Sequence, residues 1–277
     1  MARTNDKQTI RKHYDVVSPY YRSLWGEHIH HGYWRRGDES KELAQLQLIE
    51  HLAQVAGIPM GCAILDVGCG FGGTAIYLAK KLGAKVTGIT ISPVQVEMAN
   101  RAAERESADA KFILMDAEEM EFDRKFDVVW STESVSHYQD VAKFFAAAAR
   151  CLKPGGILAL TDWFQKEKLM PAEKRKFIEP IERSMMVELR AMGAYEEWMR
   201  ASGLRVVARE ILNAQCAKTW DISLDIIKEK EFWRLAASKG GEFVRFLRGF
   251  SAMRAGYASG NFAYGLLVAK TQQESKA

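Results

Sequence analysis

A glycine-rich turn follows a short apolar run in the first third of the chain. The run Ala63–Val67 is typical of a buried strand, and residues 68–73 read Gly-Cys-Gly-Phe-Gly-Gly. Glycines let the backbone turn tightly and approach a ligand closely, and a helix after such a turn offers unpaired N–H groups at its N-terminus. The spacing Gly68-x-Gly70-x-x-Gly73 therefore indicates a nucleotide platform, and dinucleotide enzymes satisfy it as well.

The residues beside this turn narrow the choice of ligand. Asp66 stands two residues before Gly68, at the end of the predicted strand. A carboxylate there can reach the amino group of a methionine-like ligand but would repel a pyrophosphate, and it can also cap the following turn. A dinucleotide enzyme has an acidic residue for the ribose hydroxyls at the end of its second strand. Residues 88–92 are instead Gly-Ile-Thr-Ile-Ser, which weighs against a dinucleotide.

The elements that must position this turn alternate between short apolar runs and helical patterns, which indicates βαβ units. We predict an α/β fold with a doubly wound, mostly parallel sheet of seven strands, at residues 63–67, 85–91, 110–114, 126–131, 157–161, 204–212 and 262–269. Helices are predicted over residues 74–81, 93–106 and 141–152, with a turn at residues 153–156. Residues 1–277 would form one domain, with a helical N-terminal lid (1–54), a cofactor-binding core (55–164) and cap helices (165–200 and 218–256).

Composition excludes several classes of protein. The four cysteines form no Cys-x-x-Cys pair, which argues against a zinc site and a disulfide framework and fits a reducing cytoplasm. The net charge is only +4, and the basic clusters are interleaved with acids, so we expect no nucleic-acid partner. The polar N-terminus and the lack of a long apolar run predict no signal peptide and no membrane span, and hence a cytoplasmic protein.

The chain resembles class I methyltransferases that use S-adenosylmethionine. Within them it resembles the branch of tocopherol-type, sarcosine/dimethylglycine-type and small-molecule O-methyltransferases and cyclopropane fatty-acid synthases. The matching residues are Leu-Asp-Val-Gly-Cys-Gly-Phe-Gly-Gly at 65–73, Val-Thr-Gly-Ile-Thr-Ile-Ser-Pro at 86–93 with Gln95, Asp116-Ala117, the fourth strand, the turn at 152–156 and His31-Gly32-Tyr33-Trp34. The resemblance is strong over residues 13–165. It implies a Rossmann-like methyltransferase fold, S-adenosylmethionine as cofactor and S-adenosylhomocysteine as product.

The resemblance also implies which residues hold the cofactor. In this branch a threonine replaces the usual acid at the end of the second strand, so the ribose contacts fall to Thr90 and Gln95. Asp116, with the Ala117 N–H nearby, is assigned to the adenine amino group, although Asp116 can equally cap a helical turn. The methionine end is assigned to Asp66, Gly68 and the segment from His30 to Tyr33. The full set of cofactor-binding positions is Asp66, Gly68, Gly70, Gly72, Thr90, Gln95, Asp116, Ala117, Ser131, His30 and Tyr33.

The residues after the fourth strand are candidates for the chemistry of the acceptor. A general base is needed only when the acceptor loses a proton, as an alcohol or phenol does. His137 is the best candidate because an unperturbed imidazole titrates near neutral pH, and Asp162, just after the fifth strand, would orient it. Some relatives use a similar His and Asp, and others have a glutamate where Glu133 lies. His137 can also be a plain hydrogen-bonded loop residue, and Glu133 can simply anchor the loop.

The paired histidines near the N-terminus can be interpreted as metal ligands or as part of a lid. His30 and His31 lack a Cys, an Asp or a third His at ligand spacing, so we expect no metal and interpret the segment as a lid over the methionine end and the substrate. The aromatic residues around it can line a pocket, although most such stripes are helix packing. Cyclopropane synthases have a cysteine at the position of His31, and its absence here argues against their chemistry.

Taken together, the sequence predicts transfer of a methyl group to a small-molecule acceptor by in-line displacement. An apolar, phenolic, prenylated or amine-containing acceptor would suit the Met-, Phe- and Trp-rich cap. Two alternatives stay open: a cofactor-binding module without catalysis, and an NAD-dependent oxidoreductase. The sequence determines neither the acceptor nor whether the protein is a monomer or a homodimer.

Overall fold

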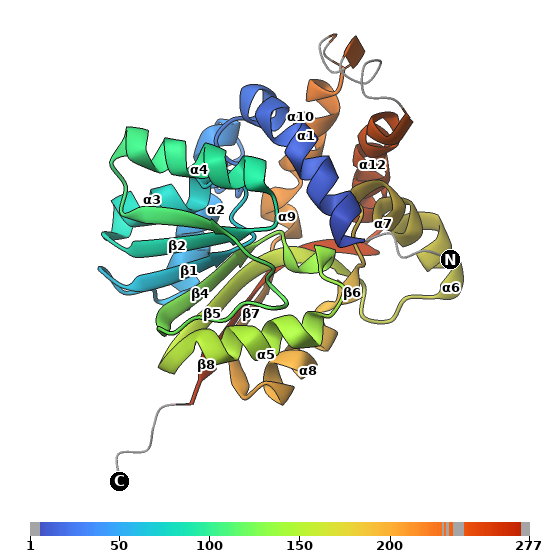
Figure 1. Ribbon diagram of the computed structural model, residues 1–277. Helices are drawn as coiled ribbons and strands as arrows, with labels where there is room; N and C mark the ends of the chain where they lie inside the picture. Colours follow the sequence, from blue (N-terminus) through green and yellow to red (C-terminus); the bar gives the residue numbers. More distant parts are fainter. Residues whose placement is uncertain (1–5, 229, 231–232, 235–240, 273–277) are drawn as a thin grey trace.

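The computed structural model describes residues 6–228, 230, 233–234 and 241–272, and parts of the predicted cap segment 218–256 therefore lie outside the described residues. One sheet forms the centre of the molecule (Figure 1). Its strands are β1 (Ala63–Val67), β2 (Lys85–Thr90), β3 (Ala110–Leu114), β4 (Phe126–Thr132), β5 (Leu152–Gln165), β6 (Arg190–Ala191), β7 (Leu204–Ile211) and β8 (Phe262–Thr271).

The strand order confirms the predicted doubly wound, mostly parallel sheet. It runs β3-β2-β1-β4-β5-β8-β7, with the first five parallel and β8 antiparallel to both β5 and β7. The two-residue strand β6, which pairs with the end of β5, falls where the sequence predicted a cap helix. β5 begins earlier than predicted, at Leu152, which pairs with Phe126 of β4, so the predicted turn at residues 153–156 falls within it. It also ends later than predicted, because its pairing with β8 continues to Gln165.

Helices cover both faces of the sheet (Figure 1). The described helices are α1 (Lys7–Trp25), α2 (Lys41–Ala56), α3 (Gly73–Leu82), α4 (Pro93–Glu106), α5 (Val141–Cys151), α6 (Pro171–Glu173), α7 (Glu179–Met185), α8 (Met192–Ala201), α9 (Asn213–Cys216), α10 (Lys218–Ile226) and α12 (Gly241–Ala258), with the 3-10 helix η1 (Val135–His137) and the π-helix η2 (Lys174–Ile178). Helices α2, α3 and α4 pack on one face, and α5 and α8 on the other.

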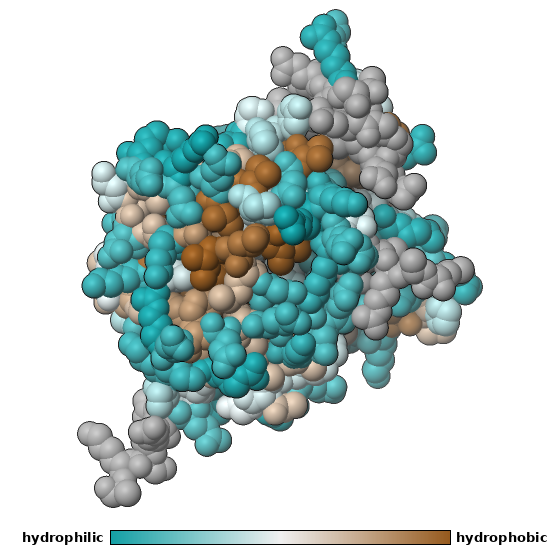
Figure 2. Space-filling view, viewed as in Figure 1, coloured by the Kyte–Doolittle hydropathy of each residue, from teal (hydrophilic) through white to brown (hydrophobic). Residues whose placement is uncertain are grey.

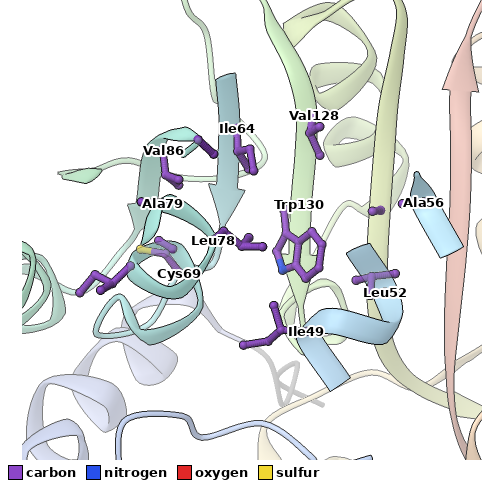
Figure 3. Packing of buried hydrophobic residues seen from close by; sticks show 14 of the residues in the cluster. Ile49, Leu52, Ala56, Ile64, Cys69, Leu78, Ala79, Val86, Val128 and Trp130 are labelled. Atoms are coloured by element: carbon purple, nitrogen blue, oxygen red, sulfur yellow. The ribbon is translucent and has the colours of Figure 1, made fainter. Parts of the chain in front are cut away.

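The alternation of side chains along each strand produces two separate cores. In β1, Ile64 packs toward α2 and α3, whereas Leu65 packs toward α5. Figure 3 shows the first core, in which the buried Trp130 of β4 lies between Leu78 of α3 and Leu52 of α2. Helix α2, which the sequence placed with the lid, is thus part of the sheet's own packing.

A third apolar cluster lies over the carboxyl edge of the sheet. It joins Val17 of α1 to Met185 of α7, Trp220 of α10 and Phe246 of α12. The N-terminal helix and the cap therefore pack on each other rather than separately on the sheet. Figure 2 shows hydrophobic side chains gathered in the middle of the face viewed in Figure 1. Over the residues that the structure describes, no helix has the length and apolar character to cross a membrane.

Candidate active site

A cavity opens at the carboxyl edge of the sheet. Its walls come from the glycine turn after β1, the ends of β2, β3 and β4, the helices α1, α10 and α12, and the segment 27–31. The carboxyl edge beside the point where the strand order reverses is where doubly wound folds bind ligands. Ten of the predicted site residues line it: His30, Asp66, Gly68, Gly70, Thr90, Gln95, Asp116, Ala117, Glu133 and His137.

Two other segments of the chain pack closely against the glycine turn. Gly68 has φ +75°, and a Cβ there would come within 2.4 Å of the Ser134 Cβ after β4. A Cβ at Gly73 would come within 2.1 Å of the Glu27 carbonyl oxygen. Glycine is required at both positions, because the loop after β4 and the N-terminal segment leave no space for a Cβ atom on the turn. Gly72 (φ +90°) does not line the cavity, because it faces Phe112 in the core.

Asp66 is a buried carboxylate beside the glycine turn with an unused acceptor. Its side chain is 2% exposed, and its Oδ2 has no hydrogen-bond partner. Burial raises the pKa of Asp66 to about 7. A buried acceptor of this kind needs a donor, and a cationic amino group would restore its ionised state.

Two neutral residues at the end of β2 hydrogen-bond each other. The Thr90 hydroxyl donates to the Gln95 Oε1 at 2.6 Å, and the Gln95 Nε2 donates to the Ser18 hydroxyl of α1 at 3.1 Å. Ser92 caps α4 by accepting from the Gln95 N–H. These groups can bond hydroxyls without adding charge.

Asp116, after β3, caps the following turn and pairs with a lysine of α1. Its Oδ1 accepts from the Glu118 N–H at 2.9 Å, which is the turn-capping role. Its Oδ2 accepts from Lys7 Nζ of α1 at 2.6 Å, and Lys7 also lies 3.3 Å from Glu118 Oε1. The lysine is a cavity residue that sequence reasoning missed, because nothing local links it to Asp116.

Glu133 is the centre of a buried hydrogen-bond cluster. Its Oε1 accepts from the His31 N–H (2.7 Å), from His31 Nδ1 (2.9 Å) and from the Tyr264 hydroxyl (2.8 Å). Burial would raise the pKa of Glu133, but the charge of His31 and its hydrogen bonds outweigh burial and hold that pKa below its usual value. Glu133 has φ +52°, a conformation that non-glycine residues adopt rarely.

His137 has partners on both ring nitrogens. Nδ1 lies 3.1 Å from the Met186 carbonyl oxygen and must donate to it, so Nε2, 3.0 Å from the Tyr14 hydroxyl, accepts from that group. Burial lowers the pKa of His137 to about 4. The imidazole is therefore neutral at pH 7, but its free lone pair is already used and it is a weak base.

Asp162 does not orient His137, contrary to the prediction. It accepts from the Ser136 N–H (2.8 Å), the Ser136 hydroxyl (3.0 Å), the Trp163 N–H (2.8 Å) and the Tyr195 hydroxyl (3.1 Å). It is fully buried and absent from the cavity wall, because these donors hold it behind η1. Its observed contacts make it an anchor for the loop after β4.

Two more predicted cofactor residues also lie outside the cavity wall. The ring of Tyr33 stacks on His51 at 4.4 Å, on the side of the core. The Ser131 hydroxyl bonds that of Ser134 at 2.7 Å and reaches the cavity only through it. His30 does line the cavity: its Nδ1 donates to the His31 carbonyl oxygen at 2.8 Å, and burial lowers its pKa.

Unpartnered polar atoms gather at this cavity. Among the described residues, nine buried side-chain nitrogen or oxygen atoms lack a hydrogen-bond partner. Seven of them belong to residues of the cavity wall: Trp25, His28, His30, His31, Asp66, Trp163 and Trp220. Buried polar groups are normally paired, so their concentration here indicates a polar ligand. The described residues hold no group of three or more His, Cys, Asp or Glu side chains arranged for a metal ion.

The fold and the similarity to named methyltransferases define a class I methyltransferase that uses S-adenosylmethionine, and its cavity joins the glycine turn to a chamber lined by aromatic side chains. A family model described as mycolic acid cyclopropane synthetase matches residues 1–251, and the chain belongs to this family.

Two relatives and one solved structure illustrate the similarity. The probable chloroplastic tocopherol O-methyltransferase of Oryza sativa subsp. japonica is 30% identical over 292 aligned positions, which cover 98% of this chain and 80% of that protein. The 27-O-demethylrifamycin SV methyltransferase of Amycolatopsis mediterranei (strain S699) is 35% identical over 216 positions, covering 76% and 79%. The mycolic acid cyclopropane synthase CmaA1, solved with S-adenosylhomocysteine and CTAB, has the same fold, with a TM-score of 0.85 at 21% identity and coverage of 95% and 98%.

Proposed function

We propose that this protein methylates a hydroxyl group on a small, largely apolar acceptor. The observation that carries the proposal is the cavity itself, in which unpartnered polar atoms at the glycine turn adjoin a chamber walled by aromatic side chains. S-adenosylmethionine supplies an electrophilic methyl group on a sulfonium when it is bound. The residues of this chain hold it, exclude water and align the acceptor, and such positioning contributes on the order of 7–11 kcal/mol.

The proposed donor contacts follow from which atoms are free or neutral. Asp66 Oδ2 and His30 Nε2 are both unpartnered acceptors, and they suit the amino group of the methionine end. Thr90 and Gln95 suit the ribose hydroxyls, since they already exchange hydrogen bonds without charge. Asp116 suits the adenine amino group, in exchange for part of its contact with Lys7.

The acceptor side is argued from the chamber. Trp163, Trp220, Phe246 and Phe250 line the cavity, and Trp220 and Phe246 belong to the cap cluster. Rings of this size favour an apolar body, while the two indole N–H groups without partners favour a few oxygen atoms on it. The two relatives are named for methylation of tocopherol and of a rifamycin, and both names fit an oxygen acceptor on an apolar molecule.

Any contact of the acceptor with His137 would run through Tyr14. Its only free lone pair accepts from the Tyr14 hydroxyl, so an acceptor could reach His137 only by displacing Tyr14 or by bonding to that hydroxyl. The weak basicity of His137 limits either route.

Calorimetry with S-adenosylmethionine and S-adenosylhomocysteine tests the donor site. We expect binding of both in the micromolar range, and no binding below about millimolar would contradict the proposal. A screen for S-adenosylhomocysteine release with tocopherol precursors, phenols, polyketide alcohols and terpene alcohols then tests the acceptor class. Release with amines and with no hydroxylated compound would overturn the proposed acceptor chemistry.

A further inference from the structure

We propose that His31, held by Glu133, removes the proton of the acceptor hydroxyl. This inference rests on the proposed methylation of a hydroxyl and assigns the residue that performs its proton step.

The geometry of the His31–Glu133 pair defines which ring nitrogen is free. Glu133 is a carboxylate and can only accept, so His31 Nδ1 carries the hydrogen that lies 2.9 Å from Oε1. When the ring is neutral, as a base must be, its lone pair is on Nε2. That atom has no partner, although His31 is only 2% exposed and lines the cavity. An unpaired buried imidazole nitrogen costs free energy until a donor reaches it, and a hydroxyl is such a donor.

The ring is also held rigidly in this orientation. It stacks on Tyr264, with centroids 4.1 Å apart and an interplanar angle of 15°, and it packs on Trp220 in a T-shaped arrangement with centroids 4.6 Å apart. The backbone N–H of His31 donates to the same Glu133 oxygen. The ionisable groups around it are Glu133, His30 and the Tyr264 hydroxyl, and Glu133 is the one whose negative charge stabilises a protonated ring. Glu133 is thus the positioning residue, and His31 is the group that touches the acceptor.

The comparison with His137 favours His31. Both histidines line the cavity and both donate from Nδ1, but His137 donates to a carbonyl and has its Nε2 occupied by Tyr14. A carboxylate partner stabilises an imidazolium, and a carbonyl does so far less. Only His31 therefore combines an unused lone pair with a charged partner.

The proton step balances as follows. A lone pair of the acceptor oxygen forms the bond to the methyl carbon, and the pair of the broken carbon–sulfur bond stays on sulfur, which becomes a neutral thioether. The proton of the hydroxyl passes to His31 Nε2, and the positive charge of the ring is neutralised by Glu133. Release of that proton to solvent, once the methylated product has left, restores the starting state.

Two variants isolate this role. His31→Asn keeps an amide donor near the position of Nδ1, and with it the bond to Glu133, but removes Nε2. Glu133→Gln keeps an acceptor for His31 but removes the charge. The matched control is His51→Gln, because His51 also pairs with a carboxylate, Glu210 at 2.7 Å, but lies outside the cavity wall.

The first readout does not depend on turnover. 4-Nitrophenol is added to protein saturated with S-adenosylhomocysteine, at a pH one unit below the pKa of the free phenol, and the phenolate absorbance is recorded. We expect phenolate absorbance above that of the same phenol free in buffer in the wild type and in His51→Gln, and no excess in His31→Asn, while calorimetry gives S-adenosylhomocysteine affinities within a few-fold of one another. No excess absorbance in the wild type, or an equal excess in His31→Asn, would overturn the proposal.

The second readout is the rate on a hydroxylated acceptor found by the screen. His31→Asn should lower kcat by about 10²–10⁴-fold, with a smaller change in KM. In Glu133→Gln, kcat/KM should fall, and the acidic limb of its pH profile should move to lower pH, which loss of packing alone would not cause. If the donor fails to bind, the proposed function is wrong. If the donor binds and the acceptor is methylated at an unchanged rate by His31→Asn, only the role of His31 is wrong.

Discussion

Replacement of Asp66 by Asn tests two effects of the buried carboxylate. The carboxylate lowers the stability of the free protein, and it strengthens binding of the cofactor. In the free protein the carboxylate is buried without a donor on Oδ2, and burial raises its pKa from 3.8 to about 7. A raised carboxyl pKa means that the folded protein binds more protons than the unfolded chain between these values. The free energy of unfolding therefore falls as pH rises from about 4 to 7.

The magnitude follows from the size of the shift. A change of about three units corresponds to roughly 4 kcal/mol, an upper limit for the contribution of this group. In Asp66→Asn that component is absent, so the fall in stability between pH 4 and pH 8, measured by urea unfolding, should be shallower than in the wild type by up to that amount.

The same substitution should weaken cofactor binding. Loss of one charge-assisted hydrogen bond costs about 1.5–3 kcal/mol, which is roughly a 10- to 150-fold rise in Kd. Because Asp66 is about half protonated at pH 7 in the free protein, binding of a cationic amino group should also release protons. The binding enthalpy of the wild type should therefore depend on the ionisation enthalpy of the buffer, and this dependence should decrease in Asp66→Asn.

Asp127→Asn is the matched control. Asp127 follows the first residue of β4, pairs with Lys153 at 2.7 Å and lies outside the cavity wall, so its loss should leave cofactor affinity unchanged. Equal affinities for the wild type and Asp66→Asn, together with no proton release, would refute the reasoning on Asp66.

Three further substitutions, the first with a matched control, test the packing around the site. Gly68→Ala should abolish cofactor binding in calorimetry, because its Cβ would clash with a serine of the loop after β4. The control is Gly83→Ala: Gly83 has φ +61° and nothing within 4 Å of an added Cβ, so this change should cost about 1 kcal/mol of stability and retain cofactor binding. Asp162→Asn should lower the free energy of unfolding by about 2–4 kcal/mol, since an amide cannot accept all four hydrogen bonds that the carboxylate accepts. The pH profile of methyl transfer should not move. A moved profile would show that Asp162 affects the histidine that takes the proton. Tyr14→Phe should cost about 1–3 kcal/mol in urea unfolding because the buried His137 Nε2 loses its donor, and unchanged stability would argue against this bond.

Much of the fold could be predicted because its signals are local. The Ala63–Val67 strand, the glycine turn and Pro93 at the start of α4 each follow from neighbouring residues, and the structure has each of them as predicted. The exact bounds of β5 and the presence of β6 were not predictable, since both depend on pairing between segments far apart in the chain.

The donor side of the site follows the same rule. Asp66, Gly68, Thr90, Gln95 and Asp116 lie at or shortly after the carboxyl end of a strand, and parallel strands bring such positions to one edge of the sheet. Their order along the chain was therefore enough to gather them at one cavity.

The acceptor side was decided only by the tertiary structure. Asp162 was predicted just after the fifth strand but lies within β5, and His137 ends η1. Asp162 accepts from the Ser136 hydroxyl, and His137 accepts from the Tyr14 hydroxyl, so the two side chains do not bond each other. His31 meets Glu133 across 102 residues of chain, through the folding of the N-terminal segment onto the end of β4. No local pattern encodes which donor reaches a buried acceptor first, because that depends on distances between elements. The sequence thus determined the class of reaction and which residues meet at the glycine turn, whereas the folded chain decides which histidine is left with a free nitrogen.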